Sequence, residues 1–155
     1  MTNKELKFEI NGKTLTVADM DWYIDGIDYI YVDRDTSAIN REYSIFIKTN
    51  MDLVKLYYKN EYFDDCFSQF EKLCTAINKV KPSFNKIPGN PTFLDFSKVE
   101  KIKVSKPIKD KLIFTLKNSE EKLVVPINFE CAKERYKSPI ELLKESRIAK
   151  NDCIL

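Results

Sequence analysis

The chain contains no histidine and only three glycines in 155 residues. Histidine is the usual general base near neutral pH and the commonest ligand of transition metals, so Ser-His-Asp and Cys-His catalysis are excluded. Gly12, Gly26 and Gly89 are too scattered to form a phosphate-binding loop, and neither a GxxxxGK[ST] nor a GxGxxG pattern occurs. We therefore expect a protein that is not an enzyme and uses no cofactor. An enzyme that uses lysine, cysteine or carboxylate chemistry is the third and weakest hypothesis.

Cysteine pairs and long apolar runs are also missing. The four cysteines (Cys66, Cys74, Cys131 and Cys153) form no CxxC pair, and the first two fall on the apolar side of a predicted helix. We expect them to be reduced and buried. The first ten residues, MTNKELKFEI, do not resemble a signal peptide, and no apolar stretch reaches the roughly 18 residues of a membrane span. These features predict a cytoplasmic protein without a membrane segment.

Charge is nearly balanced overall but unevenly distributed. The formal net charge is +2; residues 1–80 hold 10 basic and 14 acidic side chains, and residues 81–155 hold 16 and 10. The two halves thus differ by sign, about −4 against +6, which indicates either two functional faces or halves that attract each other. A net charge near zero argues against a dedicated DNA-binding protein.

Six aspartates between residues 19 and 35 raise the question of a calcium site. With Asp21 as the first residue of an EF-hand loop, Asp25 and Gly26 would fit, but Tyr23 and Val32 occupy ligand positions. We expect no metal site here. A solvent-exposed acidic edge, which discourages association between strands, explains the segment better.

The longest periodic segment predicts an amphipathic α-helix from Glu61 to Lys79. Its apolar residues recur at steps of three and four: Phe63, Cys66, Phe67, Phe70, Leu73, Cys74 and Ile77. Such a helix is stable only where its apolar side is covered, so a sheet must lie against it.

Strands are predicted on both sides of this helix. Asn11-Gly12 is a strong hairpin signal between strands at 7–10 and 14–17. Further strands are expected at 27–33, 43–49 and 53–59, and, after a proline-rich linker at 81–92, at 93–96, 99–104, 111–117 and 122–127. A final helix is expected at 139–150, with Ser138 as its N-cap.

The order of these elements predicts an internal repeat. Alternating apolar positions of the 43–59 region match those of the 112–127 region at an offset of 69 residues. We therefore expect an α+β fold made of two pseudo-repeated units, each an antiparallel sheet followed by a helix. The units would be residues 1–80 and 93–155, joined by the linker 81–92 and packed as one body. Chance agreement between alternating strands is the competing interpretation.

The favoured functional hypothesis is a small non-enzymatic binding protein, such as an adaptor, an inhibitor or an immunity-type factor encoded by a phage or mobile element. The acidic, aromatic segment would contact a protein partner, with these candidate residues: Asp19, Asp21, Trp22, Asp25 and Asp28. Trp22 is either an exposed anchor or a ring that closes one end of the sheet. The oligomeric state stays open.

The alternative hypothesis is single-stranded nucleic-acid binding on a sheet face. Alternation places aromatic and basic side chains away from the helices: Tyr29, Tyr31, Phe46, Tyr57, Lys101 and Lys103. Rings can stack on bases while lysines contact phosphates. The expected element order also resembles that of the Whirly and PUR families of single-strand binders, which implies this function as an expectation and transfers no residues. The aromatic rings could instead form a second core layer.

Overall fold

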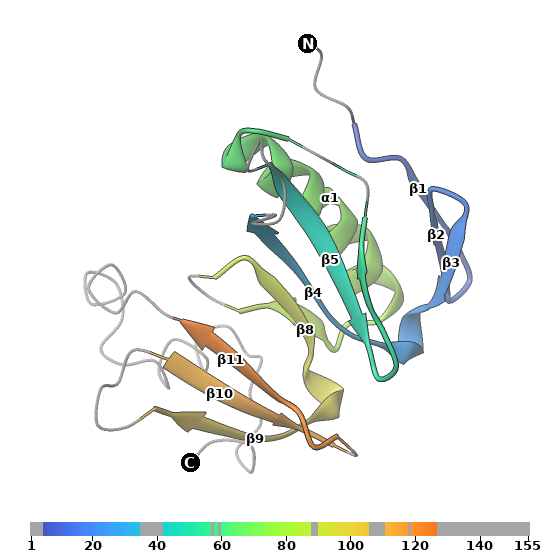
Figure 1. The fold of residues 1–155 in the computed structure, drawn as a ribbon. Coiled ribbons are helices and arrows are strands. Elements are labelled where there is room, and N and C mark those ends of the chain that lie inside the picture. The colour runs from blue at the N-terminus through green and yellow to red at the C-terminus, as the bar shows by residue number, and fades with distance from the viewer. Residues whose placement is uncertain are drawn as a thin grey trace.

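A computed structural model describes residues 5–34, 42–56, 58, 60–87, 90–105, 111–117 and 119–126. Within these residues the protein is mostly β, with eleven strands in three antiparallel sheets and one α-helix (Figure 1). The first sheet has the order β1 (Phe8–Asn11), β2 (Thr14–Val17), β3 (Met20–Tyr23). The second has the order β6 (Leu53–Lys55), β5 (Tyr43–Thr49), β4 (Ile27–Arg34), β8 (Thr92–Asp95), β7 (Phe84–Lys86). The third has the order β11 (Lys122–Pro126), β10 (Lys111–Leu116), β9 (Val99–Val104).

The predicted amphipathic helix is confirmed as α1 (Phe63–Val80), which packs against the five-stranded sheet (Figure 1). Phe70, Leu73 and Ile77 on its apolar side are fully buried, as the periodicity predicts. Cys66 and Cys74 are also buried and unbridged. Burial raises the pKa of the Cys66 thiol to about 12 and that of the Cys74 thiol well above its ordinary value. The prediction of buried thiols is confirmed for these two residues.

The predicted N-terminal hairpin is confirmed, with its loop one residue further along than expected. Asn11 pairs with Thr14, so Gly12 and Lys13 form the turn, and Gly12 has a φ of 61°. Glycine at the first turn position is typical of a type II′ hairpin. The next hairpin turns at Ala18 and Asp19, which have φ values of 48° and 65°. Positive φ at both positions is the type I′ geometry, here adopted without glycine.

Two clusters of buried side chains lie on opposite faces of the five-stranded sheet. The first joins α1, the N-terminal sheet and the near face of the large sheet, with Ile30 and Phe93 pointing into it. The second joins the far face to the C-terminal sheet, with Leu94 and Phe114 pointing into it. Phe93 and Leu94 are consecutive residues of β8, so this strand belongs to both clusters.

The prediction of two repeated sheet-and-helix units is wrong. Strands β7 and β8, which come from the predicted linker and from the start of the predicted second unit, pair into the sheet of the first unit: β8 lies beside β4, and β7 beside β8. β4 carries apolar or aromatic residues on both faces, which is typical of a strand in the middle of a sheet. A strand in that position pairs with a neighbour along each of its two edges. The likeness in element order to the Whirly and PUR families depended on the repeat and no longer applies.

Two short 3₁₀ helices connect the sheets. η1 (Ile24–Gly26) leads from β3 into β4, and η2 (Phe96–Lys98) leads from β8 into β9. The predicted strand 53–59 is shorter than expected and ends at Lys55. The predicted helix at 139–150, with its cap Ser138, lies outside the described residues, as do Cys131 and Cys153.

Candidate binding cleft

The acidic segment proposed as a partner surface does not form one surface. Asp19 and Asp21 are exposed at the β2–β3 hairpin, where Asp21 accepts a hydrogen bond of 2.5 Å from the Thr16 hydroxyl. Trp22 is only 9% exposed and packs in the first cluster, opposite Leu15. The indole therefore has a structural role in the core and cannot serve as an exposed anchor.

Asp25 belongs to a charged network with lysines of its own chain. Lys81 Nζ lies 3.1 Å from Asp25 Oδ1 and 2.8 Å from Asp95 Oδ2, and Lys13 contacts the other Asp25 oxygen at 3.2 Å. The hydrogen bonds from Lys81 and Lys13 lower the pKa of Asp25. Asp95 is fully buried, and its Oδ1 also accepts hydrogen bonds from Ser83 and Ser97. This network joins η1, the end of α1 and the start of η2.

Asp28 occupies a β-bulge in β4 and is likewise paired internally. The register with β5 shifts between Ile27 and Tyr29, which leaves Asp28 without a partner in the ladder. Its buried carboxylate accepts a hydrogen bond of 3.0 Å from Lys98, whose ammonium also donates to the Ile27 carbonyl at 2.9 Å. Asp25 and Asp28 are thus both paired with lysines of their own chain.

The aromatic residues predicted on one sheet face do lie together. Tyr31 stacks on Phe46 with ring centroids 5.1 Å apart, and Tyr29 lies 5.9 Å from Tyr31. Lys48 pairs directly with Tyr29 across β4 and β5, so its side chain lies on the same face. We call Tyr29, Tyr31 and Phe46 the aromatic face; all three are half-buried. Tyr57, the fourth predicted ring, lies outside the described residues.

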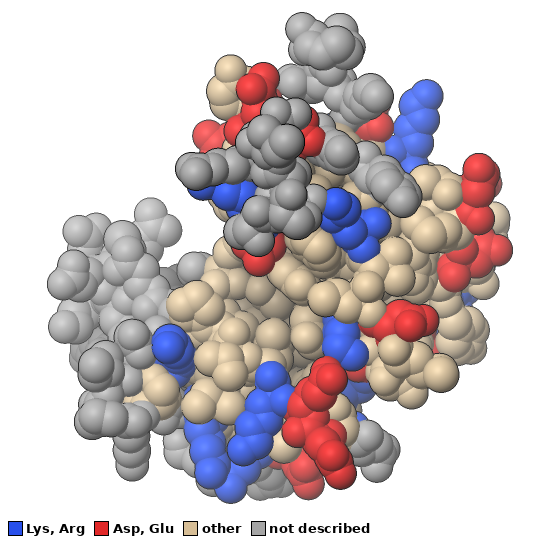
Figure 2. All heavy atoms as spheres, in the orientation of Figure 1, with Lys and Arg blue, Asp and Glu red and all other residues tan. Residues whose placement is uncertain are grey.

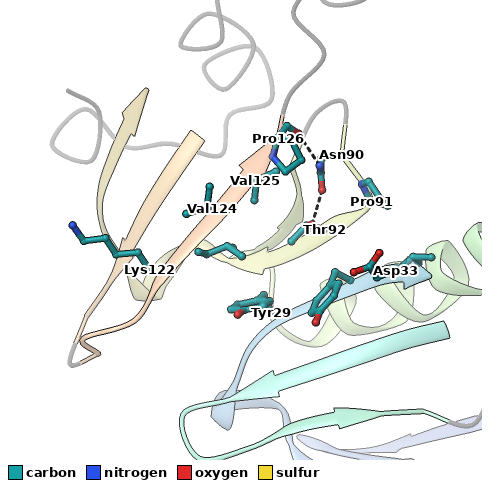
Figure 3. Close-up of a pocket in the computed structure, with 12 residues that line it drawn as sticks. Tyr29, Asp33, Asn90, Pro91, Thr92, Lys122, Val124, Val125 and Pro126 are labelled. Carbon is teal, nitrogen blue, oxygen red and sulfur yellow. Dashed lines mark hydrogen bonds between the residues drawn. The ribbon is translucent and has the colours of Figure 1, made fainter. Parts of the chain in front are cut away.

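A cleft of about 520 Å³ separates part of the aromatic face from the C-terminal sheet. Its walls come from three segments that are distant in sequence: β4 at 29–33, the residues that lead into β8 at 90–92, and the whole of β11 at 122–126. Figure 3 shows Tyr29 beneath the cleft and β11 along its other side. Asn90 closes one end, because its amide donates a 2.9 Å hydrogen bond to the Pro126 carbonyl and accepts one of 2.6 Å from the Thr92 hydroxyl.

The edge of β11 that faces this cleft has no strand partner among the described residues, where β11 pairs only with β10. Within an antiparallel strand, the N–H and C=O of one residue point to the same edge, and successive residues alternate. The Pro126 carbonyl points into the cleft toward Asn90. The backbone groups of Val124 and Lys122 therefore face the cleft as well, while the Lys122 side chain points away from it (Figure 3).

Charged side chains lie near both ends of the cleft. Burial, with smaller contributions from Tyr31, Glu121 and Asp28, raises the pKa of Tyr29 to about 12, so its hydroxyl stays protonated at neutral pH. Glu121 pairs with Lys48 at 3.5 Å at one end. At the other end Asp33 is exposed, and within the described part of the chain no cation pairs with it.

The lysines of the nucleic-acid hypothesis lie elsewhere. Lys101 and Lys103 pair with Thr115 and Ile113, whose neighbours in β10 point into the second cluster. Alternation therefore places both lysines on the outer face of the C-terminal sheet, away from the aromatic face. Figure 2 shows basic side chains gathered at the lower rim of the molecule, while its centre is mostly uncharged.

The described residues bring together no group of three metal-ligating side chains. Sequence alternation found Tyr29 and Tyr31, but it missed Asn90, Thr92 and the β11 edge, because only the packing of the C-terminal sheet brings them near β4. No α-helix in the described part of the chain has the length and hydrophobicity to cross a membrane.

No protein-family model, curated protein or solved structure matches this chain.

Proposed function

We propose that this is a non-enzymatic protein that binds a segment of another protein in the cleft between the aromatic face and the C-terminal sheet. The observation that carries the proposal is a pair of stacked, half-buried rings, Tyr31 and Phe46, beside an open cleft with an uncharged centre. Tyrosine and other aromatic residues are favoured anchors at protein interfaces because they bury large area with few rotatable bonds. An adaptor or inhibitor works in this way, and the buried free thiols of Cys66 and Cys74 suit a cytoplasmic location.

Selection from a displayed peptide library against the folded protein tests this proposal. We expect the recovered peptides to lose at least about 30-fold in affinity for the Tyr31→Ala variant, which corresponds to about 2 kcal/mol for a central anchor. The matched control is Tyr23→Ala: Tyr23 is a 60% exposed tyrosine on β3, away from the cleft. Peptides that bind both variants as well as the native protein would contradict the proposal.

Single-stranded nucleic acid is a second candidate ligand, favoured by the position of Lys48 on the aromatic face and by the pairing of Lys55 with Phe46. Two lysines predict that log K for a fluorescent oligonucleotide falls with log salt at a slope of about −1.4. Because Lys101 and Lys103 lie on the other side of the C-terminal sheet, we expect their replacement by alanine to leave this affinity unchanged. Undetectable binding at low salt would remove nucleic acid from consideration.

A further inference from the structure

We propose that the partner segment binds as an extended strand added to the edge of β11 that has no strand partner among the described residues, with a basic side chain placed over Asp33. This inference rests on the proposed function and specifies its binding mode and the chemistry of the ligand. It starts from the backbone rather than from the rings, since an unpaired strand edge inside a cleft is a template for another strand.

The edge of β11 presents backbone hydrogen-bonding groups to the cleft. Val124 and Lys122 present their N–H and C=O groups to the cleft, because they lie two and four residues before Pro126, whose carbonyl faces it. β11 is five residues long, about 17 Å, so it can pair with about five residues of a ligand. Asn90, bonded to Pro126, marks the end of the available edge.

The opposite wall of the cleft sets the pattern of side chains that a ligand must have. β4 and β11 run in the same direction on either side of the cleft (Figure 1), and Asp33, Tyr31 and Tyr29 follow one another at every second residue on one face of β4. Alternate side chains of an added strand point toward this row. A strand antiparallel to β11 meets Asp33 first and then the two tyrosines, and the antiparallel pairing is the more stable one per residue.

The two ends of the cleft differ in the charge that they offer to a ligand. Glu121 at the far end is paired with Lys48, whereas the exposed carboxylate of Asp33 accepts only the Arg34 amide, at 2.8 Å, within the described part of the chain. A cationic side chain over Asp33 and apolar side chains over Tyr31 and Tyr29 complement this arrangement. The ligand is therefore an extended segment of the pattern basic, any, apolar, any, apolar.

The probe is a capped synthetic peptide, Lys-Thr-Val-Thr-Val-Thr, titrated into the ¹⁵N-labelled protein. We expect a dissociation constant below about 1 mM, with the amide signals of Lys122 and Val124 shifting. Val124→Pro removes the N–H that faces the cleft and keeps the bonds to β10, and proline is tolerated on an edge strand in this orientation. It should weaken binding about tenfold, whereas Val124→Ala, which keeps the N–H and changes an exposed side chain, should not.

Circular dichroism and Trp22 emission identical to those of the native protein confirm that Val124→Pro is folded. Equal peptide affinity of Val124→Pro and Val124→Ala would overturn strand addition, and so would a peptide that does not bind. If the native protein sediments as a dimer that Val124→Pro dissociates, the edge serves a second copy and the inference is also overturned. Library peptides that depend on Tyr31 but not on the Val124 N–H would leave the proposed function intact and remove this binding mode alone.

Discussion

Replacement of Lys81 by methionine is expected to destabilise the protein by about 3 kcal/mol, because it leaves the buried carboxylate of Asp95 without its counter-ion. Asp95 is fully buried and lies 2.8 Å from Lys81 Nζ. Methionine keeps the apolar stem that packs near Phe84 and removes only the charge. The expected loss is at the low end for a broken buried pair, since Ser83 and Ser97 still donate to Asp95.

Urea unfolding monitored by Trp22 emission measures this effect. The matched control is the double variant Lys81→Met with Asp95→Asn, which removes both charges and should recover more than half of the loss. A loss below about 1 kcal/mol for Lys81→Met alone would place the pair with ordinary surface ion pairs.

The same pair sets the pH range of stability. Burial raises the pKa of Asp95, but hydrogen bonds from Lys81, Ser97 and Ser83 outweigh burial and hold the pKa below its ordinary value of 3.8. The contribution of the Asp95 carboxylate to the free energy of unfolding is therefore present above pH 3.8 and is lost as the pH falls through the folded-state pKa. For Lys81 the two effects on the pKa are reversed: burial lowers the pKa, and the bonds to Asp95 and Asp25 raise it above 10.5. The stabilisation from this pair is lost only in acid or in strong alkali. We expect the free energy of unfolding of Asp95→Asn to depend less on pH in the acid range.

Replacement of Phe114 by alanine is expected to cost about 3 to 5 kcal/mol, the range for truncating a buried aromatic residue. Phe114 is fully buried in the second cluster and contacts Phe96 edge to face, with ring centroids 6.1 Å apart. The cavity would loosen the sheet that carries β11, so peptide binding should be lost together with stability.

Trp22 lies in the other cluster and reports whether the two cores unfold together. Because β8 contributes Phe93 to one cluster and Leu94 to the other, we expect the Trp22 transition to shift with the circular dichroism transition. Ile113→Ala is the matched control on the outer face of β10, with an expected loss below about 1 kcal/mol. A Trp22 transition that does not move in Phe114→Ala would show that the C-terminal sheet unfolds alone.

Local patterns predicted the elements better than their arrangement. The three-to-four periodicity of 63–77 predicted α1, and Asn11-Gly12 predicted the first hairpin, because both signals act within a few residues. The pairing of β8 with β4 could not be predicted in this way, since it joins residues more than 60 positions apart and depends on which edge of β4 is free. Matching alternation between two regions therefore indicated strands but not a repeated fold.

For the candidate site, too, the sequence predicted local features but not contacts between distant residues. Alternation correctly put Tyr29, Tyr31 and Phe46 on one face, but charge counting along the chain did not show that Asp25 and Asp28 pair with lysines. Their partners, Lys81 and Lys98, lie 56 and 70 residues away in sequence, and no local pattern predicts such pairs. No residue pattern could have predicted the binding edge of β11, because backbone N–H and C=O groups form this edge.

The measurement that tests the cleft most directly is amide hydrogen exchange of the full chain with and without a peptide recovered from the displayed library. We expect new protection at the amides of Lys122 and Val124 in β11, which face the cleft and have no strand partner among the described residues. Protection confined to the hairpin at residues 18–21, with β11 unchanged, would contradict the cleft as the binding site and return the function to the acidic segment.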